Sequence, residues 1–112
     1  MNDCLFCRIA AGEIPATVLY EDDQHIAFRD INPAAPVHAI VIPKAHYGTL
    51  LDVPDAGVHG ALLEAACAAA RALGLEQGGF RLVANFGGDG GQEVMHVHWH
   101  LLGGRLLGWP PG

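Results

Sequence analysis

Short apolar segments in the first half of the chain predict β-strands. Residues 18–20 and 26–28 are apolar on either side of the acidic residues 21–23, a pattern typical of a hairpin with short strands. Residues 37–42 are apolar except for His38, and a proline follows them, which predicts a buried strand. Residues 4–11 are expected to form one or two helical turns.

The second half combines a helical pattern with two further strand candidates. Residues 55–73 are rich in alanine and place five apolar side chains on one helical face: Val58, Leu62, Ala65, Ala69 and Leu73. Residues 80–85 and 95–102 are expected to be strands. Residues 87–91 are expected to be a loop, because four glycines in five positions make a regular element entropically costly. Hairpins with one substantial helix and no regular strand–helix alternation predict an α+β fold with a mainly antiparallel sheet.

Length and composition indicate one folded domain. The 112 residues are expected to form a single domain over residues 1–112, with a core of 1–103 and a tail of 104–112. Hydrophobic residues make up 51% of the chain and charged residues 16%, which argues against disorder. Because so short a chain builds only a small core, a dimer interface is expected to bury the surplus apolar surface.

Charge and segment lengths exclude several partners. With 12 acidic and 6 basic residues, the net charge of −6 disfavours nucleic acid polymers, although one small nucleotide can still be held. No apolar segment approaches the ~20 residues that span a bilayer, so no membrane partner is expected. Residues 1–4 lack the basic start of a signal peptide, and the cytoplasm is therefore the expected compartment.

Three histidines near the C-terminus form the most informative pattern. On a strand, His96, His98 and His100 share one face, and the apolar residues between them share the other. A rise of ~3.3 Å per residue separates His96 from His100 by ~13 Å, so one metal ion cannot bind all three. The row suits a linear catalytic apparatus in which a nucleophile lies between two helpers. The alternative is a solvated strand face that happens to be rich in histidine.

The glycine-rich segment before this row adds an anion site. Residues 88–92 can present successive backbone N–H groups without obstruction by Cβ atoms, which favours phosphate. Alone, such a segment is usually only a turn. Beside three histidines it suggests phosphoryl transfer, because imidazole can act as the nucleophile and then leave phosphorus again.

Residues 96–102, HVHWHLL, resemble the His-X-His-X-His-X-X signature of the histidine-triad (HIT) superfamily. Residues 19–46 and 82–112 are similar to its Hint branch, which hydrolyses nucleoside phosphoramidates. The resemblance implies an α+β fold with a five-stranded antiparallel sheet, one long and one short helix, and a sheet that continues across a homodimer. It implies cleavage of purine nucleoside 5′-phosphoramidates. The alternatives are hydrolysis of dinucleotide polyphosphates, or a nucleotide-binding or zinc-stabilised interaction module with little turnover.

Residue by residue, the same resemblance assigns the site. His98 corresponds to the nucleophile that attacks the α-phosphorus, His100 contacts the phosphate, and His38 supports the row that His96 begins. The implied phosphate contacts are Asn85, Gly91 and Gln92. The implied ribose contact is Asp30, and the implied base pocket consists of Leu5, Phe6, Phe28 and Ile31.

Glu93 departs from the eukaryotic members of the family, which carry a serine there. That serine helps to protonate the leaving group. Glu93 is a candidate general acid in its place, on the condition that burial keeps its carboxyl group protonated.

A second group of residues is suited to a metal ion. Cys4 and Cys7 form a C-x-x-C pair whose thiolates can share one ion. The resemblance implies that His46 and His96 complete a Cys₂His₂ site for a structural zinc. The alternative is two reduced thiols near a chain end. No organic cofactor is expected. Among the remaining histidines, His25 is expected to be solvated in the hairpin.

Overall fold

The structure is a computed structural model that describes residues 3–112. Residues 1–2 lie outside the described residues. They include the start of the predicted domain and half of the segment that was compared with a signal peptide. None of the described helices has the length and apolar character needed to cross a bilayer. The cytoplasmic location and the domain boundaries stay predictions.

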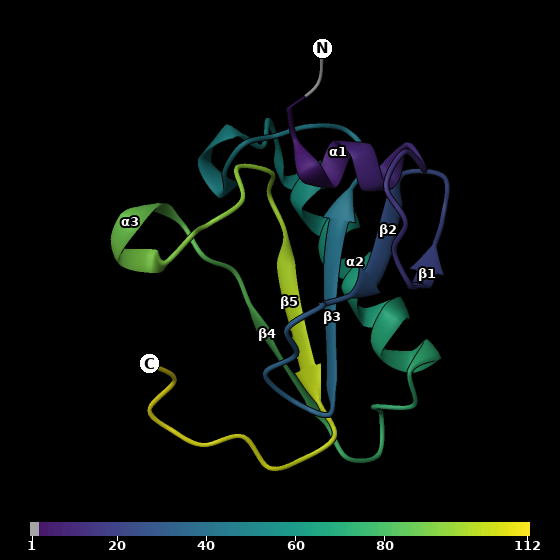
Figure 1. Cartoon of the computed structure of the whole chain (residues 1–112). Helices are drawn as coiled ribbons and strands as arrows, with labels where there is room; N and C mark the ends of the chain where they lie inside the picture. Colours follow the sequence, from purple (N-terminus) through teal and green to yellow (C-terminus); the bar gives the residue numbers. More distant parts are fainter. Residues whose placement is uncertain (1–2) are drawn as a thin grey trace.

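One antiparallel sheet of five strands forms the centre of the molecule (Figure 1). Its strands, in chain order, are β1 (Val18–Glu21), β2 (His25–Arg29), β3 (Val37–Pro43), β4 (Phe80–Val83) and β5 (Trp99–Gly103). They lie side by side in the order β1-β2-β3-β5-β4, so β3 and β5 are neighbours although they are distant in sequence. The predicted α+β class and antiparallel sheet are confirmed.

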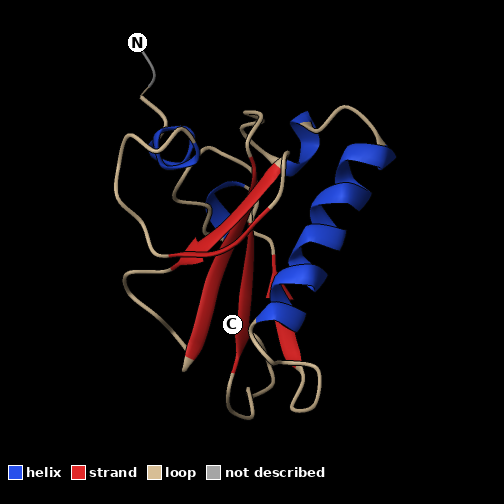
Figure 2. Ribbon diagram, turned by 90° about the vertical axis from the view of Figure 1, so that its right-hand side faces the viewer, coloured by secondary structure: helices blue, strands red, loops and turns tan. Residues whose placement is uncertain are grey.

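The long helix α2 (Ala56–Ala72) covers one face of the sheet (Figure 2). It begins where the Asp55 side chain accepts a hydrogen bond from the Val58 N–H, which satisfies one of the free donors of the first turn. Its buried face consists of Leu62 and four alanines: Ala65, Ala66, Ala69 and Ala70. These small side chains let the helix approach Ala27, Ala39 and Val41 in the sheet closely.

The short helix α1 (Leu5–Ala10) lies on the other face of the sheet. Its buried Phe6 packs in a second apolar cluster with Ile26, Phe28, Ile40 and Ile42. The Cys4 side chain caps this helix by accepting a hydrogen bond from the Cys7 N–H. Helix packing therefore brings the C-x-x-C pair to the face of the sheet that α2 does not cover.

The prediction of a loop over residues 87–91 was wrong, because residues 87–90 form a single helical turn, α3 (Gly87–Gly90). The Gln92 N–H donates to the Gly87 carbonyl and the Gly91 N–H donates to the Gly88 carbonyl, which closes the turn. Gly91 has a φ of +75°, the left-handed conformation that glycine adopts readily. The Asn85 side-chain amide also donates to the Gly90 carbonyl. These bonds offset the entropic cost of ordering four glycines.

The predicted strand over residues 95–102 was also wrong in its first half, because β5 begins only at Trp99. The Val97 N–H donates to the Tyr47 carbonyl, which lies outside the sheet. The His96 N–H bonds to the Val94 carbonyl two residues earlier. His96 and His98 therefore lie in irregular backbone, and the three histidines do not share one flat strand face.

A further short element is the 3₁₀ turn η1 (Leu50–Asp52). After β5, the C-terminal segment runs back along β4. The Arg81 guanidinium donates to the carbonyls of Leu107 and Gly108 and lies 5.9 Å from the centre of the Trp109 ring.

Candidate active site and metal centre

The orientation of His98 is fixed by the backbone beside it. Its Nδ1 lies 2.7 Å from the His96 carbonyl oxygen. A carbonyl can only accept, so Nδ1 carries the proton, and in the neutral ring Nε2 keeps a free lone pair. The His98 side chain is 7% exposed. The irregular backbone before β5 thus presents one imidazole nitrogen as a nucleophile.

One backbone donor determines which nitrogens of His38 and His100 carry the protons. The Ala34 N–H donates to His38 Nδ1 at 2.9 Å, so the proton of the neutral His38 ring is on Nε2. His38 Nε2 lies 2.9 Å from His100 Nδ1 and donates to it. His100 therefore carries its own proton on Nε2. The centre of the His100 ring lies 5.0 Å from that of the His98 ring, so the two imidazoles are neighbours.

Burial keeps this pair of rings uncharged. It lowers the pKa of His100 to about 4, and the nearby rings of His98 and His38 act in the same direction. Burial also lowers the pKa of His38. The Asp30 carboxylate opposes both shifts. At neutral pH, His38 and His100 are therefore neutral donors and acceptors with the proton positions given above.

An apolar pocket of about 640 Å³ opens beside the row. It is lined by the five residues that the sequence assigned to base and ribose: Leu5, Phe6, Phe28, Asp30 and Ile31. The Phe6 ring packs edge-on against His98, with 5.2 Å between ring centres. Asp30 Oδ2 lies 3.4 Å from His38 Nε2. The structure thus brings the predicted pocket and the histidines together.

The residues predicted to contact phosphate surround the turn α3, but their side chains are partly engaged. The Gln92 amide nitrogen donates to the carbonyls of Gly48 and Val94, at 2.8 and 3.0 Å. Its Oε1 is buried and has no hydrogen-bond partner among the described residues. Glu93 is exposed and lies with Cys4, Cys7 and His46 at the edge of a different pocket. The burial required for Glu93 as general acid is therefore absent in the chain.

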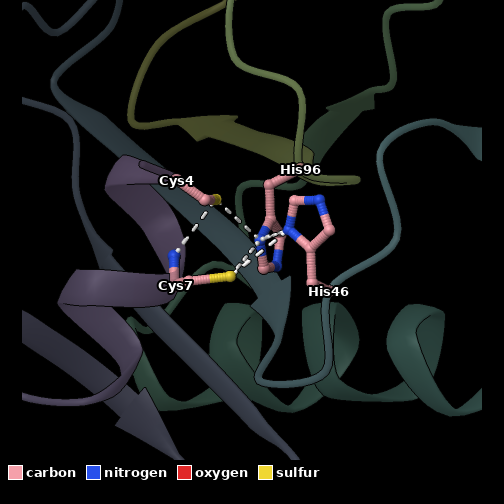
Figure 3. A group of neighbouring side chains, drawn as sticks. All are labelled: Cys4, Cys7, His46 and His96. Atoms are coloured by element: carbon pink, nitrogen blue, oxygen red, sulfur yellow. Dashed lines mark hydrogen bonds between the residues drawn. The ribbon is translucent and has the colours of Figure 1, made fainter. Parts of the chain in front are cut away.

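Four side chains, which include that of His96, meet at a second place (Figure 3). One ligand atom from each of Cys4, Cys7, His46 and His96 lies within 4.8 Å of the others. His96 Nε2 donates to the Pro43 carbonyl at 2.8 Å, which leaves the Nδ1 lone pair facing the thiols.

The spacing of these atoms fits a tetrahedral zinc ion. His96 Nδ1 lies 3.3 Å from the Cys4 sulfur, 3.4 Å from the Cys7 sulfur and 3.2 Å from His46 Nδ1. Tetrahedral bonds of ~2.1 Å to nitrogen and ~2.3 Å to sulfur separate ligands by about 3.4–3.6 Å. Two thiols and two imidazole nitrogens are also the donors that zinc prefers. The group can therefore hold zinc with little rearrangement.

Sequence reasoning missed the backbone partners and one buried pair. No sequence signal identifies the carbonyls of Pro43 and His96 as acceptors, because their roles depend on the assembled fold. His25 was predicted to be solvated, but it is 8% exposed and bonds through Nδ1 to Asp22 Oδ1 at 3.0 Å. An aspartate three residues before a histidine in a hairpin turn was the available signal.

Comparison with known proteins places the chain in a family. The HIT domain family matches residues 11–107. The chain is 54% identical to a HIT family hydrolase from Legionella pneumophila, with a TM-score of 0.93, covering 98% of this chain and 100% of that one. It is 46% identical to a 14 kDa zinc-binding protein of Brassica juncea, over 98% of this chain and 100% of that protein.

A histidine triad nucleotide-binding protein from Candida albicans is 33% identical, with a TM-score of 0.83, covering 98% of this chain and 85% of that one. The family match extends over residues 11–107 and confirms the resemblance that residues 96–102 indicate. The chain belongs to the HIT domain family.

Proposed function

We propose that the chain is a Hint-type hydrolase that cleaves purine nucleoside 5′-phosphoramidates to the nucleoside monophosphate and an amine. The observation that carries the proposal is the free Nε2 lone pair of His98, on a ring that neighbours the His100 ring and packs against Phe6 of the apolar pocket. The names of two relatives support hydrolysis and nucleotide binding, a family hydrolase and a nucleotide-binding protein.

In the first proposed step, the purine occupies the apolar pocket and the ribose hydroxyls donate to Asp30. His98 Nε2 attacks the α-phosphorus while the P–N bond breaks and its electron pair leaves with nitrogen. The leaving nitrogen takes a proton from water, since Glu93 is exposed. The His100 Nε2–H donates to a phosphate oxygen, where it stabilises the charge of the transition state.

In the second step, water attacks the phosphorus of the nucleotidyl-His98. The intermediate is a cationic ring, with phosphorus on Nε2 and the proton still on Nδ1. Its hydrogen bond to the His96 carbonyl becomes stronger with that charge. When water displaces it, the ring leaves as neutral imidazole, the nucleoside monophosphate carries the new oxygen, and one proton passes to solvent.

A substrate panel tests the proposal. Purified protein is given an adenosine 5′-phosphoramidate or a diadenosine polyphosphate, and release of AMP is measured; AMP binding is measured separately. The proposal predicts a higher kcat/KM for the phosphoramidate. Preference for the polyphosphate would favour the dinucleotide alternative, and AMP binding without turnover of either substrate would favour a binding module.

We propose in addition that Cys4, Cys7, His46 and His96 hold a structural zinc ion. The fit of the donor atoms supports this, as does the name of the Brassica juncea relative, a zinc-binding protein. The zinc would fix α1 and the loop of His46 to the segment before β5. No reaction step passes through it, and the displacement chemistry needs no organic cofactor.

A homodimer with a continuous sheet completes the proposal. The supporting observation is the open edge of β4, on which no strand of residues 3–112 lies. Apolar side chains of β4, of the residues after it and of the segment that Arg81 contacts are exposed: Phe80, Phe86 and Trp109. Pairing of two such edges would bury part of this surface and satisfy the free backbone groups.

A further inference from the structure

Asp30 belongs to two parts of the site at once. It directly follows β2 and lines the apolar pocket, where the proposed function places the ribose. Its Oδ1 accepts a hydrogen bond from the Asn32 N–H at 2.8 Å, which fixes the orientation of the carboxylate. Its Oδ2 then lies 3.4 Å from His38 Nε2, with both side chains largely buried.

Asp30 approaches His38 Nε2, the nitrogen that donates to His100. His38 Nε2 faces two acceptors, His100 Nδ1 at 2.9 Å and Asp30 Oδ2 at 3.4 Å. A negative charge beside Nε2 favours the form of the ring in which this nitrogen carries the proton. If the proton moved to Nδ1, it would oppose the Ala34 N–H. His100 Nδ1 would then lose its donor.

We propose that Asp30 is a positioning residue for the histidine row. Its Oδ2 acts together with the Ala34 N–H to hold the proton of His38 on Nε2, so that His100 keeps its acceptor side toward His38 and its Nε2–H toward the phosphate. This inference rests on the proposed function and deepens it. One carboxylate then serves both the recognition of the ribose and the orientation of the phosphate donor.

Electrostatics within the site support this role. The titratable groups that act on His100 are His98, His38 and Asp30, and the carboxylate alone among these three raises its pKa. Asp30 also raises the pKa of His38 against the stronger, opposite influence of burial. Removal of the negative charge is therefore expected to alter both rings, even without substrate.

The test combines a variant with a modified substrate. In Asp30→Asn, a side chain that keeps its bond to the Asn32 N–H must present an amide N–H to His38 Nε2, donor against donor. We expect kcat for an adenosine 5′-phosphoramidate to fall about tenfold, the effect of losing one hydrogen bond to a charged group. The same loss is expected with the 2′,3′-dideoxy substrate, which offers no ribose hydroxyls. Asp30→Ala, which can neither donate nor accept, should show a similar loss.

Asp23→Asn is the matched control, because Asp23 is exposed and the same change of charge occurs away from the row. Its kcat should equal that of the unmodified protein. If the unmodified protein and Asp30→Asn have the same kcat and KM for the dideoxy substrate, Asp30 acts on the ribose alone and the inference is overturned.

A second readout separates this inference from the proposed function. The ¹⁵N chemical shifts of the imidazole rings report which nitrogen carries the proton, and they need no substrate. We expect Asp30→Asn to change the His38 and His100 signals and Asp23→Asn to leave them unchanged. If the ¹⁵N chemical shifts of His38 and His100 are unchanged in Asp30→Asn, the inference is overturned. Absence of turnover in the unmodified protein, with altered rings in the variant, contradicts the proposed function alone.

Discussion

The proton positions of His38, His98 and His100 can be read from the hydrogen-bond partners of their ring nitrogens. The His96 carbonyl fixes the proton of His98, and the Ala34 N–H fixes that of His38. Backbone groups have one hydrogen-bonding polarity, so they determine the protonation pattern of side chains that could otherwise switch. In the proposed mechanism, His98 and His100 thereby have different roles, one as nucleophile and one as donor, although both are histidines.

The first prediction at this scale concerns the nucleophile. His98→Ala should lower kcat on an adenosine 5′-phosphoramidate by ~10³-fold or more, because no other lone pair replaces Nε2. AMP should still bind, since His98 is not among the side chains that line the apolar pocket. Steady-state kinetics and calorimetric titration with AMP provide the measurements. A variant with nearly normal turnover would refute the assignment of His98.

The second prediction concerns stability in acid. The ordinary pKa of a histidine is 6.5, and that of His100 is about 4 in the folded protein. Between these values the unfolded chain binds the extra proton, so stability falls as the pH falls from about 6.5 to about 4. The difference between the two pKa values corresponds to a loss of about 3 kcal/mol from this group, which is complete once the folded form is protonated as well.

Urea unfolding at pH 7 and pH 4.5 checks this contribution. His100→Gln lacks the titrating group, so its free energy of unfolding should fall less between the two pH values than that of the unmodified protein. The comparison cancels acid effects elsewhere in the chain. Equal losses of unfolding free energy in both proteins would show that folding does not lower the pKa of His100.

At the scale of elements, sequence patterns predicted the helices and strands whose formation depends on residues close together in the chain. The apolar face of α2 was recognisable because the helical spacing of apolar residues matches its burial. The strand β3 was recognisable because its nearly continuous apolar segment is buried along its length. The turn α3 and the start of β5 were not, since both depend on hydrogen bonds formed in the folded chain. The Val97 N–H bonds to Tyr47, and the Gln92 amide bonds to Gly48, both far away in sequence.

The same contrast holds in the site. Residue types and family resemblance selected His98, His100 and five residues that the structure places around one pocket, because spacing and chemistry are visible in the sequence; the roles assigned to them stay predictions. The link from Asp30 to His38 was not predictable, since it joins two strand ends across a turn. The exposure of Glu93 was equally invisible, because burial is a property of the assembled surface.

A prediction about elements follows from the contacts of α1. Replacing Cys4 and Cys7 together by serine should remove about one zinc per chain and lower the melting temperature, because metal binding is coupled to folding. Cys67→Ser in α2 is the matched control and should keep its metal. Elemental analysis and thermal unfolding measure both effects. A freshly purified protein without zinc would support the alternative of two reduced thiols.

At the scale of the whole molecule, the apolar edge at β4 and the C-terminal segment lie together. Arg81 holds this segment beside β4, and Trp109 remains 81% exposed. Light scattering at micromolar concentration should therefore give twice the chain mass of 11.8 kDa. Phe80→Glu, which places a charge at the edge, should shift the protein toward the monomer. A monomeric unmodified protein would exclude the continuous sheet.

The central claim is that His98 attacks phosphorus and water then displaces it. Each in-line displacement inverts the configuration at phosphorus, so two successive displacements give retention. The direct measurement uses an adenosine 5′-phosphoramidothioate of known configuration at phosphorus, hydrolysed in ¹⁸O-labelled water. The configuration of the labelled product is then determined. Net retention is the result expected for a nucleotidyl-His98 intermediate. Net inversion would mean that water attacks directly, and it would contradict the role of His98 as nucleophile even in an active phosphoramidase.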